Sequence, residues 1–240
     1  MTKVTERLAD LASGVFLSSA QVTDVQRLTE RFVQIDLQAE SFRTTSWTPG
    51  AKLQIRPRRG TMSLRTYTPV RWDTEQGGTR LVAHTHGDGP GRDWFRAVQV
   101  GDVCEFIGPR GSIDLRELSG PVLFVGDESS IGLAAALREV GRDVRYVFEA
   151  ADPAELTGAL DRLGLAEGAV VLERSEDRAA LIHEAAGTPG PFDLVVTGDA
   201  ATVHAVRRAS REWTAGPGTT KGPRRTLGKA YWAKGRTGLD

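Results

Sequence analysis

The tetrapeptide Arg65-Thr66-Tyr67-Thr68 carries side chains suited to binding a flat, phosphorylated molecule. A guanidinium can pair with a phosphate through forked hydrogen bonds, a tyrosine can lie against a ring system, and a threonine hydroxyl can reach a heteroatom. On a strand, Arg65 and Tyr67 would share one face, and Pro69 favours a strand end just beyond Thr68. These are the groups that hold a flavin dinucleotide, although an ordinary exposed strand with one core tyrosine has the same pattern.

The surroundings of this tetrapeptide are basic. Between Ser41 and Trp72 the chain has seven basic side chains and no carboxylate, whereas the whole chain has 31 basic and 31 acidic residues. This local concentration of positive charge suits an anionic ligand.

A glycine-rich loop leads from a predicted strand into a predicted helix shortly afterwards. Such a loop presents free backbone amides and the positive end of a helix dipole, which suits a phosphate. The candidate flavin-binding residues of this segment are His84, Thr85, His86, Gly87, Gly89, Gly91 and Trp94. The two histidines could suggest a metal, but no third ligand stands nearby, so we assign no metal ligand. An N-capping loop without a ligand is the simpler alternative.

A second group of candidates follows predicted strands in the later part of the chain. Gly126-Asp127-Glu128-Ser129-Ser130 comes directly after an apolar run, at the place where open α/β sheets bind dinucleotides. With one glycine and two acids it is a poor pyrophosphate cradle by composition, and a plain turn is the alternative. Gly198 and Asp199 form a similar turn. Arg174 could meet the 2′-phosphate of NADPH or lie at a solvated helix start.

The elements that must position these residues differ between the two halves of the chain. Up to about residue 117, apolar residues alternate or form short runs broken by turn residues. This pattern predicts strands at 32–37, 52–55, 80–83 and 103–107, with one helix at about 91–98. Short strands at this spacing favour an antiparallel Greek-key β-barrel.

From residue 120 onward, apolar runs alternate with helical patterns. The strands are predicted at 121–125, 144–148, 169–172 and 192–196, and the helices at 131–140, 153–163, 177–186 and 202–213. This order indicates a Rossmann-like doubly wound parallel sheet. We therefore expect an N-terminal extension at 1–14, an FAD-binding barrel domain at 15–118 and an NAD(P)H-binding α/β domain at 119–240 that ends in a basic tail.

Composition excludes several other classes of protein. Zero net charge argues against a nucleic-acid binder, and no apolar run approaches the roughly 20 residues that span a bilayer. Glu6 and Asp10 interrupt the N-terminus where a signal peptide needs an apolar core. Cys104, the single cysteine, excludes a disulfide framework and is expected in the core. These features fit a cytoplasmic protein, and they leave the oligomeric state open.

The segments described so far, in their order along the chain, resemble the siderophore-interacting proteins. These are NAD(P)H-dependent ferric-siderophore reductases of the ferredoxin-reductase superfamily. The resemblance covers roughly residues 15–240 and is carried by Arg65, Tyr67 and Thr68, by His86, Gly87, Gly89 and Pro90 with Trp94, by Val125–Ser129, by Thr197–Ala201, and by Tyr231, Trp232, Gly235 and Arg236. The chain departs from the family pattern at Ser129, where threonine is usual, and at Gly91, where alanine is usual.

The resemblance implies a flavoprotein oxidoreductase that passes electrons from NADPH or NADH through FAD to a ferric siderophore or another iron chelate. The first group of candidates would bind FAD and the second group NAD(P)H. Because ferric siderophores are often anionic, the basic tail is expected to attract the substrate. Its candidate residues are Lys221, Arg224, Lys234 and Arg236. A solvated tail, a general flavin or quinone reductase or redox partner, and a non-catalytic iron-chelate carrier are the alternatives.

Overall fold

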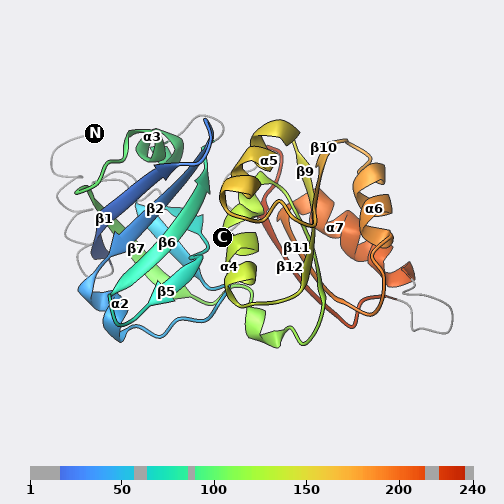
Figure 1. Ribbon diagram of the computed structural model, residues 1–240, viewed down its shortest axis with the longest axis horizontal. Coiled ribbons are helices and arrows are strands. Elements are labelled where there is room, and N and C mark those ends of the chain that lie inside the picture. Colours follow the sequence, from blue (N-terminus) through green and yellow to red (C-terminus); the bar gives the residue numbers. More distant parts are fainter. Residues whose placement is uncertain (1–16, 57–63, 86–89, 214–221, 236–240) are drawn as a thin grey trace. The chain divides into compact units, whose positions relative to one another are not determined.

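The computed structural model describes residues 17–56, 64–85, 90–213 and 222–235. The chain divides into two units, Met1–Asp114 and Leu115–Asp240 (Figure 1). The sequence places the domain boundary after residue 118, near this division.

The first unit is built on a seven-stranded antiparallel sheet with the order β4-β3-β7-β1-β2-β6-β5. The strands are β1 (Ser18–Arg27), β2 (Phe32–Gln38), β3 (Lys52–Arg56), β4 (Arg65–Tyr67), β5 (Arg71–Asp73), β6 (Gly78–His84) and β7 (Val103–Arg110). Strand β4 also contacts β6, so the two ends of the sheet approach each other and the sheet curls into a barrel (Figure 1). The predicted antiparallel barrel is confirmed.

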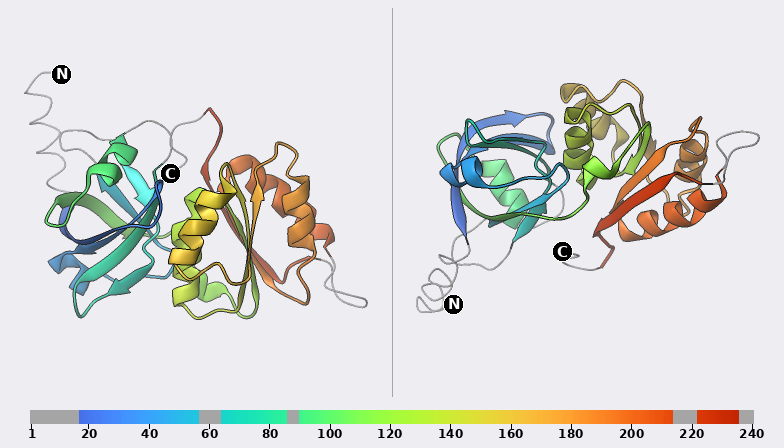
Figure 2. Two further views of the ribbon diagram at one scale, coloured as in Figure 1. Left: turned by 45° about the horizontal axis from the view of Figure 1, so that its top comes forward. Right: turned by 90° about the horizontal axis from the view of Figure 1, so that it is seen from below.

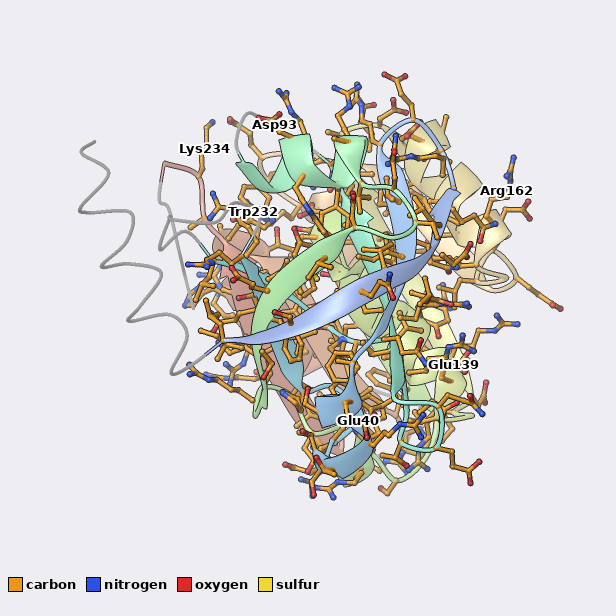
Figure 3. The ribbon with its side chains drawn as sticks, turned by 90° about the vertical axis from the view of Figure 1, so that its left-hand side faces the viewer. Glu40, Asp93, Glu139, Arg162, Trp232 and Lys234 are labelled. Carbon is orange, nitrogen blue, oxygen red and sulfur yellow. The ribbon has the colours of Figure 1, made fainter. Side chains whose placement is uncertain are left out.

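Two short helices lie at opposite ends of this barrel. They are α2 (Glu40–Thr44) and α3 (Pro90–Ala97), and Glu40 and Asp93 mark their positions in Figure 3. The barrel is filled by the inward-facing apolar side chains of its strands together with Phe95 of α3. Cys104 is buried among them, as the sequence predicts.

The sequence predicted α3 and the four most apolar strands, but it missed β1, β5 and α2. Strand β1 buries only Ala20 and Val22 of its ten residues, because its other side chains are at least partly exposed and all of them except Val25 are polar. A strand with so few buried positions carries little of the alternation on which the prediction depends.

The second unit is a five-stranded parallel sheet with the order β10-β9-β8-β11-β12. The strands are β8 (Val122–Gly126), β9 (Val144–Ala150), β10 (Ala169–Glu173), β11 (Asp193–Asp199) and β12 (Arg225–Trp232). The helices are α4 (Ile131–Glu139), α5 (Pro153–Arg162), α6 (Ala179–Ala186) and α7 (Ala200–Ala209), and 3₁₀ turns occupy Leu115–Glu117, Glu128–Ser130 and Ser210–Glu212. Helices α4 and α5 cover one face of the sheet, and α6 and α7 cover the other (Figures 1 and 2). The predicted doubly wound fold is confirmed.

This strand order places a topological switch point between β8 and β11. The chain runs outward from β8 through β9 to β10 and then returns to β11 on the other side of β8. Ligands of open α/β sheets bind outside the carboxyl ends of the strands at such a point. The turns after β8 and β11 therefore lie at the position expected of a nucleotide site.

The expectation of a basic tail is corrected by β12. Residues 225–232 form a strand that pairs in parallel with β11 along its whole length. Within the described residues, no helix is long and apolar enough to cross a membrane.

The burial of side chains in the second unit leads to a first testable prediction. Val147 of β9 is fully buried, whereas Val103 of β7 is 57% exposed. Val147→Ala removes two buried carbon atoms and leaves a cavity, so we expect it to lower the free energy of unfolding by about 2 kcal/mol. Val103→Ala, the matched control, should change it by less than about 0.5 kcal/mol. Chemical denaturation measures both, and equal losses would contradict the assigned core.

Candidate functional site

The tetrapeptide predicted to bind a flavin occupies β4 and the residue that follows it. Strand β4 pairs with β3 so that Tyr67 lies opposite Leu53 and Arg65 opposite Ile55. The strand ends at Tyr67, which leaves Thr68 outside the ladder of backbone hydrogen bonds. Arg65 is exposed and Tyr67 is half-buried. A guanidinium and a phenol thus lie on the same side of the strand near its end.

The start of α3 lies against these two side chains. A Cβ atom added at Gly91 would lie 3.0 Å from Cγ of Arg65 and 3.5 Å from the hydroxyl oxygen of Tyr67. The tetrapeptide and the glycine-rich helix entry, which are about 25 residues apart in the sequence, are therefore neighbours in space. The end of the helix that carries a partial positive charge thus adjoins the aliphatic stem of Arg65.

The opposite end of α3 is fixed to the barrel by Arg27 of β1. The Arg27 guanidinium donates hydrogen bonds to the carbonyl oxygens of Phe95, Arg96 (3.0 Å) and Val98 (3.2 Å). These carbonyls end the helix without intrahelical partners, so an arginine is a suitable cap. This contact determines where the N-terminus of the helix lies.

Aromatic packing fixes the side of α3 that faces the core. The ring of Tyr67 meets Phe95 edge-on, with 4.9 Å between ring centroids, and Trp94 meets Phe95 edge-on at 4.7 Å. Burial raises the pKa of the Tyr67 phenol well above its ordinary value, so the hydroxyl keeps its proton and acts as a hydrogen-bond donor.

Two of the other predicted flavin residues have contacts within the barrel. His84 stacks on Phe32 with 4.7 Å between ring centroids, and the Thr85 hydroxyl donates to the carbonyl of Arg31 at 3.1 Å. These contacts anchor the start of the glycine-rich segment. His86, Gly87 and Gly89 lie outside the described residues.

At the carboxyl edge of the second sheet, the buried carboxylate of Asp127 joins three segments. Its Oδ1 accepts hydrogen bonds from the backbone N–H of Ser129 (2.9 Å) and from the hydroxyls of Ser129 and Ser130. Its Oδ2 accepts from the backbone N–H of Asp199 (2.9 Å) and from Nε1 of Trp232 (2.8 Å). The turn after β8 and the ends of β11 and β12 are thereby tied to one another.

Gly198 provides the space for this carboxylate. Its φ is +115°, and a Cβ atom there would lie 2.4 Å from Oδ2 of Asp127. Only glycine satisfies both the backbone conformation and the close approach. Burial raises the pKa of Asp127, and its hydrogen bonds partly oppose this shift.

The neighbouring acid, Glu128, is also buried and paired. Its Oε1 accepts from the backbone N–H of Ala151 at 2.6 Å, and its Oε2 binds the guanidinium of Arg174. The Arg174 guanidinium also lies over the ring of Trp232, 5.4 Å from the centroid. The predicted nucleotide residues Glu128 and Arg174 are therefore brought together as partners.

A second arginine closes the network on the side of α7. Arg178 donates to Oδ2 of Asp199 (2.9 Å) and to the hydroxyl of Thr202 (2.8 Å). Thr202 in turn donates to the buried Glu149 at 2.5 Å. Sequence reasoning missed Glu149, Arg178 and Thr202, because no spacing along the chain relates them.

The four residues predicted to attract the substrate are not gathered in one place. Arg224 precedes β12 and pairs with Asp193 at 3.4 Å, whereas Lys234 follows β12. An eight-residue strand separates them, which corresponds to roughly 26 Å. Lys234 is exposed and extends away from the strand (Figure 3). Lys221 and Arg236 lie outside the described residues.

Comparison with known proteins identifies the family. Residues 15–113 match the family model of the siderophore-interacting FAD-binding domain. Residues 15–113 belong to the siderophore-interacting FAD-binding domain family. The predicted family is thus confirmed, whereas no curated protein matches the chain.

Several solved structures share the fold over at least 90% of this chain. The siderophore-interacting protein SipS from Aeromonas hydrophila is 20% identical, with 92% of this chain and 93% of that chain covered and a TM-score of 0.72. A siderophore utilization protein from T. fusca is 25% identical, with coverage of 93% and 96% and a TM-score of 0.70. Phthalate dioxygenase reductase is 18% identical over 90% of this chain and 69% of its own, with a TM-score of 0.66. The fold is that of the ferredoxin reductases.

The described residues of the first unit suit FAD. The exposed Arg65 guanidinium has forked donors that suit a phosphate, and the lack of a side chain at Gly91 lets the Arg65 stem lie close to the start of α3. Together with the family and the fold, these residues support flavin-dependent redox activity.

The close approach of Gly198 to the Asp127 carboxylate leads to a second prediction, which compares two glycines of positive φ. Gly190→Ala, at φ +75° with open space around it, should cost about 1–2 kcal/mol through backbone strain alone. Gly198→Ala must also displace the Asp127 carboxylate from its donors, so we expect a loss larger by at least about 3 kcal/mol. Chemical denaturation of both variants separates the two effects. Losses of equal size would show that the carboxylate has room to move.

Glu149 yields a third prediction, on the pH dependence of stability. Burial raises its pKa in the folded chain above that in the unfolded chain, despite hydrogen bonding to Thr202 and attraction to Arg174. The folded state therefore binds the proton more tightly, and this contribution to stability is present at low pH and declines as pH rises from about 4.3 through the folded pKa. Glu149→Gln removes the titration. The difference in melting temperature, wild type minus variant, should fall between pH 4 and pH 8, and a constant difference would contradict the shift.

Proposed function

We propose that this chain is an oxidoreductase that passes electrons from NAD(P)H through FAD to a ferric-siderophore chelate and releases Fe(II). The family model on residues 15–113 supports the proposal most directly. When bound, FAD would supply the redox chemistry: one hydride from NAD(P)H carries two electrons, which reduce two Fe(III) chelates and give NAD(P)⁺, two Fe(II) and one proton. Reduction loosens the chelate, because hard oxygen donors hold Fe(III) far better than Fe(II).

The residues of the first unit would bind and orient the flavin. Arg65 and the free amides at the start of α3 would hold its phosphates. The Tyr67 hydroxyl, which keeps its proton, would donate a hydrogen bond, and Thr68 would approach the edge of the ring system from beyond the strand end. Gly91 would let the Arg65 side chain stay close to the start of α3.

The residues of the second unit would hold the nicotinamide nucleotide. The turn Gly126–Ser130 lies at the switch point of the sheet, and Gly198 and Asp199 lie beside it because both turns are bonded to the Asp127 carboxylate. Such a rigid edge would position the nucleotide without rearrangement on binding.

Basic side chains would attract the substrate, which is often anionic. Of the predicted residues, Lys234 follows β12 directly and so lies at the carboxyl edge of the sheet, whereas Arg224 lies at the opposite end and already pairs with Asp193. We therefore assign substrate attraction to Lys234 before Arg224. The single thiol, Cys104, is buried and unpaired, which fits a reducing cytoplasm.

An acceptor assay tests the proposed function. The purified chain, loaded with FAD and kept free of oxygen, should lose its yellow colour when NADH or NADPH is added. A ferric chelate with oxygen donors should then restore the colour, with two Fe(II) trapped by a ferrous chelator for each nucleotide consumed. Free flavin or quinone reduced more than tenfold faster than the chelate would indicate a general reductase. A protein that stays colourless after FAD is added would indicate a carrier.

Paired arginine variants test the flavin assignment. Arg65→Ala removes a charge-assisted contact to phosphate, so FAD affinity should fall by about tenfold or more. Arg43→Ala is the matched control, because Arg43 belongs to the same unit but bonds to Glu40 and to the carbonyl of Glu75 beside α2. Titration followed by FAD absorbance measures both affinities. Equal affinities would remove Arg65 from the flavin site.

A further inference from the structure

Arg174 is the arginine that follows β10, at the carboxyl edge where a nicotinamide nucleotide would bind. Its backbone N–H donates to the carbonyl of Ala150 at 2.8 Å, which fixes the residue against the end of β9. A guanidinium at such a place is the natural partner of the 2′-phosphate that distinguishes NADPH from NADH. Its availability therefore bears on the choice between the two nucleotides.

The guanidinium of Arg174 already has partners within the protein. It is paired with Oε2 of Glu128, lies 4.0 Å from Glu149 at its Nε, and covers the ring of Trp232. Glu128 is unable to swing away readily, because it is buried and its other oxygen accepts from the backbone of Ala151. A 2′-phosphate would have to displace a buried carboxylate that has no other partner for its charge.

The second arginine of this edge is occupied in the same way. Arg178 is bonded to Asp199, to Thr202 and to the carbonyl of Glu176. The side chains at this edge thus include four buried carboxyl groups and two guanidiniums, and we refer to them as the cluster. These carboxyl groups belong to Asp127, Glu128, Glu149 and Asp199. No positive charge in this cluster is left to balance a phosphate, whereas a neutral ribose 2′-hydroxyl adds no charge.

We propose that the nucleotide is NADH and that the Glu128–Arg174 pair determines this specificity by withholding the guanidinium from a 2′-phosphate. The proposal rests on the proposed function, since it concerns the electron donor of the same reaction. Glu128 acts through Arg174, so it is a positioning residue.

Two measurements on the FAD-loaded protein test the specificity. In the first, anaerobic flavin reduction should show kcat/KM at least about tenfold higher for NADH than for NADPH. In the second, calorimetry compares adenosine 5′-monophosphate with adenosine 2′,5′-bisphosphate, which differ only in the 2′-phosphate, and the monophosphate should bind about tenfold more tightly. Tighter binding of the bisphosphate would overturn the inference even if neither nucleotide reduced the flavin. Reduction by neither nucleotide would instead remove the proposed function.

Variants test the role of the pair. Glu128→Gln removes the charge that holds Arg174, so the preference for NADH should fall at least about fivefold. Glu184→Gln is the matched control, because it removes a similar partner from Arg145 near the start of β9, and it should leave the preference unchanged. Arg174→Gln provides a second measurement should Glu128→Gln fail to fold. It should change kcat/KM for NADPH by less than twofold relative to that for NADH, and a selective tenfold loss with NADPH would overturn the proposal.

Discussion

The carboxylate of Asp127 is the interaction on which the second unit depends. A buried carboxylate needs hydrogen-bond donors in place of water, and here the donors come from the turn after β8, the end of β11 and the end of β12. Because each donor occupies a definite direction around the two oxygens, the three segments have little freedom to move apart. Gly198 is required at the end of β11 for the same reason, since any side chain there would occupy the place of the carboxylate.

The first unit positions its site by a different means. Arg27 binds the carbonyls at the end of α3 and so determines where the start of the helix lies, next to Arg65 and Tyr67. Here a cation completes the hydrogen bonding of a helix end. Both units therefore meet the requirement that buried polar groups be paired. In the second unit the group that needs partners is a carboxylate, and in the first unit it is the set of carbonyls at the end of a helix.

The sequence predicted what depends on local pattern. Alternating and continuous apolar runs located the central strands of both sheets, and Gly91 at the start of α3 proved to be a neighbour of Arg65 and Tyr67. The sequence did not predict β1 and β12, because these strands carry mostly half-exposed or exposed side chains and so lack a clear apolar pattern. The hydrogen bond between Asp127 and Trp232 joins residues 105 positions apart, and neither residue type by itself predicts such a contact. Arg174 likewise looked available for a phosphate, because its partner Glu128 lies 46 positions earlier.

The composition of the turn after β8 counted against nucleotide binding, and the structure shows where the two acids of this turn are directed. Asp127 and Glu128 would repel a pyrophosphate if they faced it, but both are buried and directed at donors of the protein itself. Close packing at this edge also needs more than one glycine. Gly126 avoids Phe124 and Ser130, and the second close approach is made by Gly198 from another strand. Close packing at this edge thus depends on glycines from two strands, which is why a search for several glycines in one loop does not find it.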